Sequence, residues 1–389
     1  MDLLLRRRTM MAPPAREEYI IFADPVVGQI CATNWGDGVG ITPSQAAQVT
    51  TIGTTFYNNA NITSFKELLY FTGITTLPAN AFRYCTNLTT IGIPKNVTSS
   101  ASTAFGNMSS ITSIYIEDLD KFLGITWAAQ AAHPFGGNSI HTGTLYLNDV
   151  AVTSVSYPST IASISAYSLL GCSSVTSITV PSSVTSIGTY AFGYCSGVKT
   201  LTVNANVSVD NNTFAAAGDG TATLYHAGSV TAVRNGQMDG FKNISIGGSV
   251  AVQANNGILS QNSGAETLRI GSLDVSANSY GIARYTPNNL KFIEIGGDVI
   301  SNGNKIIGQW ANTQTNIIVH LGKNGISFDL ATTGSGTLFC SLVEKIYVGP
   351  GTSQAADQAV LNAYLADAEW SAYASKLDLW SNYNGDYKN

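Results

Sequence analysis

The stretch IASISAYSLLGCSSVTSITVPSSVTSIGTYAFGYCSGVKTLTVNAN (residues 161–206) contains the same pattern of residues twice. When it is shifted along itself by 23 residues, Cys172 falls on Cys195 and Ile178 falls on Leu201. A fixed period of about 20 to 50 residues is typical of stacked-repeat proteins, in which each unit buries its apolar side chains against its neighbours. The stretch therefore predicts a solenoid, a class of protein that binds other molecules more often than it transforms them.

The same unit occurs twice more upstream, in ITTLPANAFRYCTNLTTIGIPKN (74–96) and in VTSSASTAFGNMSSITSIYIEDL (97–119). Each copy follows the pattern V-x-x-I-x-x-x-A-F-x-x-C-x-x-L-x-x-I-x-I-P with local substitutions. The I-x-I part alternates apolar residues with Ser or Thr, which predicts a half-buried strand. The A-F-x-x-C part has the spacing of one helical or 3₁₀ turn, and the final proline ends the pairing of the strand.

Strand-forming segments continue past the clear copies, mostly at steps of 20 to 25 residues, although the A-F-x-x-C landmark is lost after residue 205. We interpret residues 51–205 as clear repeats, with an insertion near 118–146 and a hairpin that turns at Asn148–Asp149. Residues 206–350 are interpreted as degenerate repeats of the same solenoid, and a separate β-domain is the alternative. The later strand segments are Leu224–His226, Ile244–Ile246, Leu268–Ile270, Ile293–Ile295, Ile317–Val319 and Ile346–Val348.

Both ends of the chain have the features of caps, which a solenoid needs because its terminal repeats have a neighbour on one side only. Residues 1–50 predict an N-terminal segment and cap with a strand, a helix, a glycine-rich turn and a second helix. Residues 351–389 predict a helical cap and tail. Apolar residues about one turn apart in SQAADQAVLNAYLADAEWSAYASKL (353–377) predict the helix, and either Thr352 or Ser353 is its expected N-cap.

The repeated unit resembles the BspA-like subclass of leucine-rich repeats, whose pattern is the one given above. The match is specific at 74–116 and 161–203, and LYLNDVAVTSVSYPSTIASI (145–164) resembles the inter-repeat hairpin of that family. The resemblance implies a β-rich α/β fold: a right-handed leucine-rich-repeat-like solenoid with a parallel sheet on one face, short helical or 3₁₀ turns on the other, an N-terminal cap and a C-terminal capping helix. The family occurs in surface proteins and adhesins of gut and oral bacteria, in some protists and in phages of Bacteroidales, and catalysis is unusual in it.

The composition is poor in charge and argues against several classes of function. Charged residues make up 11% of the chain, against about 25% in an average soluble domain, and the net charge is −5. Basic residues form no cluster beyond Arg6–Arg8, so the sequence predicts no nucleic-acid partner. No apolar run approaches the roughly 18 residues of a membrane span, and the N-terminus lacks the apolar stretch of a secretory signal.

Three of the five cysteines, Cys85, Cys172 and Cys195, occupy the same position of the repeat. An odd number of widely spaced cysteines does not indicate a disulfide framework. We therefore predict that these three thiols are reduced and stack in the interior as small apolar groups.

The sequence contains no recognisable catalytic or metal-binding constellation. The motifs H-E-x-x-H, G-x-S-x-G and G-x-x-x-x-G-K are absent. His133 and His141 have no metal-ligand spacing and are predicted to lie in a surface loop. The stretch NWGDGVGITPSQAA resembles a calcium loop, but Asp37 is its single carboxylate, whereas calcium takes about six to eight oxygen ligands. We predict a glycine turn there, and we predict no catalytic residue, no metal and no cofactor.

The outward positions of the predicted strands offer a recognition surface. Tyrosine and arginine are favoured as binding anchors because each gives a large contact area at a modest entropy cost. Spaced along a sheet, such residues could stack on sugars or hold a protein, although tyrosine also prefers strands for structural reasons alone. The candidate binding residues are Tyr115, Tyr146, Tyr225, Arg269, Glu294 and Tyr347.

Three functions fit these observations, in decreasing order. The first is a non-catalytic component of a phage virion (tail, fibre or capsid surface), assembled in the host cytoplasm, because the N-terminus lacks a secretory signal. The alternative is a bacterial cell-surface or secreted adhesin, which is the commoner setting of these repeats. A glycan-active enzyme comes third because acid and base motifs are absent. The expected partners are other virion or surface proteins and a host-surface protein or glycan, bound by several copies of the chain in one assembly.

Overall fold

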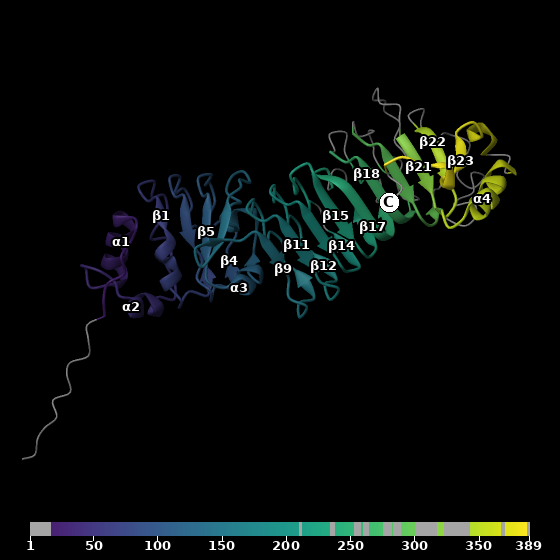
Figure 1. The fold of residues 1–389 in the computed structure, drawn as a ribbon. Coiled ribbons are helices and arrows are strands. Elements are labelled where there is room, and N and C mark those ends of the chain that lie inside the picture. Colours follow the sequence, from purple (N-terminus) through teal and green to yellow (C-terminus); the bar gives the residue numbers. More distant parts are fainter. Residues whose placement is uncertain are drawn as a thin grey trace, which may run out of the picture.

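The computed structural model describes residues 17–209, 212–233, 238–252, 258–259, 264–274, 282, 289–300, 317–322, 343–366 and 370–386; the Arg6–Arg8 cluster and Cys340 lie outside them. The chain winds into an elongated stack of coils with helices at its two opposite ends (Figure 1). The α-helices are α1 (Pro25–Trp35), α2 (Pro43–Gln48), α3 (Leu119–Leu123) and α4 (Gln354–Ala366), and the 3₁₀ helices are η1 (Lys66–Tyr70), η2 (Gln130–Ala132), η3 (Trp370–Tyr373) and η4 (Trp380–Asn382).

The I-x-I part of each coil forms one line of parallel strands, the long strand line, which follows the stack. Ile178 lies beside Leu201, and Leu201 lies beside Leu224, so that equivalent apolar residues of successive coils stack in the interior. The alternation of buried and half-buried residues in these strands is the one that the sequence predicts. The line consists of β1 (Ser64–Phe65), β3 (Thr90–Gly92), β5 (Ser113–Ile116), β7 (Thr144–Leu147), β9 (Ser154–Ser156), β11 (Ser177–Val180), β13 (Thr200–Val203), β15 (Ala222–His226), β17 (Phe241–Val252), β18 (Thr267–Asp274), β19 (Phe292–Ile295), β21 (Ile317–Leu321), β22 (Val343–Val348) and β23 (Leu377–Leu379).

A second line of short parallel strands, which the sequence does not predict, runs beside the first. Ser186 and Ile187 pair with Ser163 and Ile164 of the preceding coil. In the coils of β17 and β18 a single long strand contributes to both lines, with an irregular register between Ile246 and Ser249. The short strands are β2 (Thr76–Leu77), β4 (Ser99–Ser100), β6 (Thr126–Trp127), β10 (Ser163–Ile164), β12 (Ser186–Ile187), β14 (Val207–Val209), β16 (Val230–Val233) and β20 (Val299–Ile300).

In the coils that contain it, the A-F-x-x-C part forms single 3₁₀-type turns instead of a helix. The backbone N–H of Cys85 donates to the carbonyl of Phe82 at 3.0 Å, and that of Cys195 donates to the carbonyl of Phe192 at 3.3 Å. Thus the parallel sheet, the 3₁₀ turns opposite it and the helical ends, all expected from the repeat pattern, are confirmed.

Strand pairing continues across residue 205, where Val203 pairs with His226, but it stops once earlier in the stack. Strand β7 pairs with β8 (Val150–Ala151) in an antiparallel hairpin, and the next coil starts a new sheet at β9. The hairpin turns at Asn148 and Asp149, whose φ angles of 48° and 67° suit a tight hairpin turn, so this prediction is confirmed. One apolar core nevertheless extends through both sheets. The division of the chain into four segments stays a prediction.

Side chains of the same type stack in rows, both inside the core and along its rim. The rings of Phe82 and Phe105 stack at 5.4 Å, one repeat apart. Threonine forms a second ladder at the rim, where the Thr176 hydroxyl donates to the carbonyl of Thr153 at 2.9 Å. The repeat therefore specifies both an apolar stack and the hydrogen bonds that join successive coils.

The predicted cysteine ladder is confirmed, because Cys85, Cys172 and Cys195 are free and fully buried. The thiol of Cys85 donates to the carbonyl of Phe56 at 2.8 Å, and that of Cys195 donates to the carbonyl of Leu169 at 3.0 Å. Burial raises the pKa of Cys85 to about 11 and that of Cys195 to about 12, so both are thiols at neutral pH.

Substitution by serine is expected to lower the free energy of unfolding less at Cys195 than at Cys172. Cys195→Ser keeps a donor for Leu169, so the free energy of unfolding should fall by less than about 1 kcal/mol. Cys172 has no hydrogen-bond acceptor among the described residues, so Cys172→Ser buries an unpaired hydroxyl and should cost about 1–3 kcal/mol. Urea denaturation of the two variants measures the difference, and equal losses would contradict it.

At the N-terminus, the strand predicted before the first helix is wrong, whereas both helices are confirmed. One backbone hydrogen bond, from Ile20 N–H to the Ile41 carbonyl at 2.9 Å, holds this segment together with side-chain hydrogen bonds from Ser44 N–H to Glu17 and from Tyr19 to Asp37. The Ile21 side chain is 91% exposed. One bond does not make a ladder, so the segment stays extended without pairing. Asp24 caps α1, and its carboxylate also accepts hydrogen bonds from the backbone N–H groups that enter β1.

At the C-terminus, the predicted helix over 353–377 is shorter than expected, although Ser353 caps it by accepting from the Ala356 N–H at 3.1 Å. After η3 the chain becomes extended and adds β23 to the edge of β22. Asp357, fully buried in the first turn of α4, accepts from Gly351 N–H and Ser381 N–H, each at 2.8 Å. The tail is therefore part of the sheet and is held by a buried carboxylate.

The prediction of a surface loop for both histidines is wrong for His133, which is fully buried. Its ring lies 4.6 Å from that of Trp127, and its Nδ1 accepts from the Phe135 N–H at 3.1 Å. The long coil between β5 and β7 folds this segment inward, where aromatic side chains cover it. His141 is half-buried.

Candidate binding face

The six candidate residues lie on the outward side of the long strand line, in two groups. Strand register places four of them in one row that also includes Ser245, His320 and Asp378. Tyr115 and Tyr146 are paired neighbours in the other sheet. The row of four runs Tyr225, Arg269, Glu294 and Tyr347.

In the first group, Tyr115 is enclosed by its neighbours. Its ring stacks on Tyr146 at 4.6 Å with an interplanar angle of 8°, and the Lys66 ammonium lies 4.7 Å from the centre of the Tyr115 ring. Lys66 also forms an ion pair with Asp149 of the hairpin turn. Both faces of Tyr115 are therefore engaged, which leaves no free face for a sugar ring to stack on.

The position of Lys66 follows from the way η1 crosses the outward face of the sheet. A side chain at Gly92 would lie 2.3 Å from the Lys66 carbonyl and 2.9 Å from Leu69, so the close approach of η1 requires glycine at this position. Burial raises the pKa of the Tyr115 hydroxyl, and the hydrogen bond to Asp149 raises the pKa of Lys66. Lys66 is thus a fixed cation at neutral pH.

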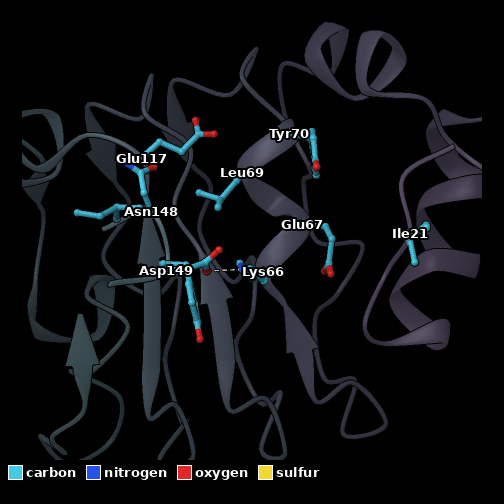
Figure 2. Close-up of a pocket in the computed structure, with 10 residues that line it drawn as sticks. Ile21, Lys66, Glu67, Leu69, Tyr70, Glu117, Asn148 and Asp149 are labelled. Carbon is cyan, nitrogen blue, oxygen red and sulfur yellow. Dashed lines mark hydrogen bonds and ion pairs between the residues drawn. The ribbon is translucent and has the colours of Figure 1, made fainter. Parts of the chain in front are cut away.

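A cleft of about 320 Å³ lies along η1 in this region. Figure 2 shows Glu67 and Tyr70 on the side of η1 that faces Ile21, and the Lys66–Asp149 pair on the opposite side. The walls of the cleft combine carboxylates with aliphatic and aromatic side chains. They are Ile21, Lys66, Glu67, Leu69, Tyr70, Tyr115, Ile116, Glu117, Asn148 and Asp149.

In the second group, Glu294 is the centre of a charged network. Arg269 Nε donates to Glu294 Oε2 at 2.9 Å, and His320 Nδ1 lies 3.1 Å from Glu294 Oε1. Burial raises the pKa of Glu294, but the hydrogen bonds and charges of His320 and Arg269 outweigh it and hold the pKa below its usual value. His320 Nε2 also lies 2.8 Å from the Gly349 carbonyl, so both ring nitrogens lie beside oxygen atoms.

The C-terminal tail covers this second group. Trp380 stacks on His320 at 3.7 Å, and Tyr383 packs at 5.0 Å from Tyr347. Phe292, which also points outward, is fully buried beneath them. Tyr347 is therefore half-covered by its own chain, whereas Tyr225, 52% exposed, is open to a partner.

Sequence reasoning missed the residues that complete both groups. His320 occupies an outward strand position beside Glu294, so the strand pattern could have found it. Lys66 and Trp380 carry no such signal, because each reaches the face from an irregular segment outside the repeat pattern.

Among the described residues there is no cluster of three or more His, Cys, Asp or Glu that could hold a metal ion. Asp37 instead closes the glycine-rich turn by accepting from the N–H groups of Val39 and Gly40, at 3.0 and 3.1 Å. None of the helices in the described part of the chain has the length and apolar character that crossing a bilayer requires.

The parallel coils, their apolar ladders and the open strand face define a solenoid of the leucine-rich-repeat class. The model of the BspA type leucine rich repeat region matches six copies in residues 43–125 and 139–235, and these residues consist of repeats of this family. No curated protein matches the chain.

Two solved structures are similar in part. A leucine-rich repeat protein from Bacteroides ovatus ATCC 8483 is 14% identical, with 73% of this chain and 68% of that chain covered and a TM-score of 0.34. A leucine rich cell surface protein from Faecalibacterium prausnitzii A2-165 is 16% identical, with 80% of this chain and 86% of that chain covered and a TM-score of 0.26.

Proposed function

We propose that the protein binds a macromolecule through the outward side of its long strand line, without chemical turnover. The observation that carries the proposal is the row through Tyr225, Arg269 and Glu294, because successive coils hold its side chains at fixed spacing. A preorganised array lets several weak contacts add without each being ordered separately on binding. The family supports a non-catalytic role.

The family also favours a bacterial cell-surface adhesin over a virion component. These repeats occur most commonly in surface proteins, whereas the virion hypothesis depends on the N-terminus, which lies outside the described residues. We therefore propose a cell-surface or secreted location, with a protein or glycan of another cell as partner. Several copies on one surface would raise avidity by about 10²–10⁴ where the geometry permits, so a modest single-site affinity suffices.

Tyr225→Ala is expected to reduce attachment about fivefold or more, because Tyr225 is the open aromatic anchor of the row. The measurement counts protein-coated fluorescent beads retained on epithelial cell monolayers. Tyr194→Ala is the matched control, since Tyr194 lies on the turn side of the coil, where it stacks on Tyr190 at 6.3 Å. A Tyr194 variant that loses attachment while the Tyr225 variant retains it would place the binding surface elsewhere.

A further inference from the structure

The cleft along η1 is unbalanced in charge. Three carboxylates line it, from Glu67, Glu117 and Asp149, against the single ammonium of Lys66. That ammonium is already engaged by Asp149 and by the ring of Tyr115. Glu117 has a lysine, Lys95, at 3.8 Å, and its side chain is 40% exposed. The cleft therefore retains a negative potential that a cation can meet.

Glu67 contributes a carboxylate oxygen that no described residue satisfies. Its Oε1 accepts from the Ala23 N–H at 2.9 Å, whereas its Oε2 is buried and has no donor among the described residues. A buried acceptor without a donor costs about 1–3 kcal/mol, and more when it is charged. Because Oε2 has almost no accessible surface, a cation in the cleft is attracted by the charge of the Glu67 carboxylate and reaches this oxygen only when the side chain turns towards it.

Apolar surface adjoins this carboxylate. Ile21 is 91% exposed and Tyr70 is 47% exposed, and both line the cleft on the side of η1 where Glu67 lies (Figure 2). Lysine and arginine combine an aliphatic stem with a cationic head that donates hydrogen bonds, which matches this combination of walls. A glycan fits less well, because both faces of the neighbouring Tyr115 are engaged.

We infer that the cleft binds the lysine or arginine side chain of an extended protein segment, with the cationic head on Glu67 and the stem against Ile21 and Tyr70. The inference rests on the proposed binding function and names the chemistry of one of its partners. It also assigns the first sheet a role separate from the row around Tyr225.

The test measures binding of a hexapeptide of alternating leucine and arginine, carrying a neutral fluorophore, to the full chain by fluorescence anisotropy. The matched probe replaces arginine with citrulline, which keeps the shape and removes the charge. The arginine peptide is expected to bind about tenfold more tightly, because hydrogen bonds between charged groups are the stronger ones. Glu67→Gln retains the acceptor for Ala23 and should remove that preference. Glu344→Gln, an exposed site outside the cleft, makes the same charge change and should leave the preference intact.

Equal binding of the two peptides, or a preference that survives Glu67→Gln, would overturn the inference. So would tighter binding of a neutral hexasaccharide that Glu67→Gln weakens, because it would assign the cleft to a sugar. The attachment assay with Tyr225→Ala is independent of Glu67. Loss of attachment in that variant, combined with no peptide preference, would leave the proposed function standing and remove the role of the cleft.

Discussion

Between pH 7 and pH 4 the free energy of unfolding is expected to fall, with His133 contributing about 3 kcal/mol of the loss. The imidazole is fully buried among the rings of Phe122, Trp127 and Phe135, and its Nδ1 accepts a backbone hydrogen bond, so the folded state holds it neutral. Burial, and to a lesser degree the charge of His141, lowers its pKa to about 3, from 6.5 in the ordinary case.

The direction of the effect follows from proton binding. Because the folded pKa is depressed, the unfolded chain takes up the proton first as the pH falls below 6.5. The stability that the neutral ring provides is complete above that pH and is lost progressively towards pH 3. Each pH unit within this window corresponds to about 1.4 kcal/mol, which gives the expected loss by pH 4.

Urea denaturation at pH 7 and pH 4 measures this contribution. His133→Asn keeps an acceptor for the Phe135 N–H but does not titrate, so its loss between the two pH values should be smaller than that of the unchanged protein by about 3 kcal/mol. Any cavity made by the smaller side chain affects both pH values equally and cancels in the comparison. Parallel losses in the two proteins would mean that the ring is accessible to protons in the folded state.

Asp24→Ala is expected to lower the free energy of unfolding by about 3 kcal/mol and to release the N-terminal cap. Asp24 is 4% exposed, and its Oδ1 accepts from the N–H groups of Val26 and Val27 at 2.9 and 3.4 Å. Its Oδ2 accepts from Thr63 N–H at 2.6 Å, Thr63 Oγ1 at 3.0 Å and Ser64 N–H at 3.4 Å. One carboxylate therefore joins the start of α1 to the start of β1.

The electrostatics of Asp24 agree with this role. Burial raises its pKa, but the hydrogen bonds from Thr63, Val26 and Val27 outweigh burial and lower the pKa overall, so the charged form is favoured in the folded state. Removing the carboxylate leaves buried backbone donors without partners. Because a solenoid unwinds from its ends, loss of a cap also exposes the first coil.

Hydrogen exchange measured by mass spectrometry locates the effect. Asp24→Ala should increase exchange in residues 25–35 and 64–65 and leave the coil around β13 unchanged. Asp37→Ala is the matched control, because Asp37 also accepts backbone hydrogen bonds but lies at an exposed turn, where the expected cost is below about 1 kcal/mol. Equal effects of the two substitutions would contradict the role of Asp24 as the joint.

The sequence predicted those strands in which apolar and polar residues alternate over at least four positions and in which this alternation recurs from one repeat to the next. The strand at Ile178–Val180 alternates apolar and polar residues over four positions and recurs 23 residues later, so its burial and register follow directly. The short strand Ser186–Ile187 spans two residues, too few to show a period, and was therefore missed. The tail strand Leu377–Leu379 was not predicted, because it starts at the last residue of the helical stretch 353–377 and its alternation spans only three residues.

The sequence could predict which residues lie on the candidate face, but not which other side chains contact them. An outward strand position identifies Tyr225 and Glu294, because neighbouring coils stack in register. It does not reveal that Trp380 covers His320, since that contact joins the tail to a strand that precedes it by many residues. For His133 the sequence predicted exposure where the structure has burial. Its segment contains glycine and proline and resembles a surface loop, but it is folded beneath aromatic rings.

Site-specific photo-crosslinking tests the proposed binding face most directly. A benzophenone amino acid replaces Tyr225 on the outward row in one protein and Tyr194 on the turn side in another, and each protein is irradiated on the surface of cells to which it attaches. The account predicts that the Tyr225 position forms a covalent adduct with a cell-surface component and that the Tyr194 position does not. An adduct from the Tyr194 position alone would contradict it, because the partner would then contact the turns and not the strand face.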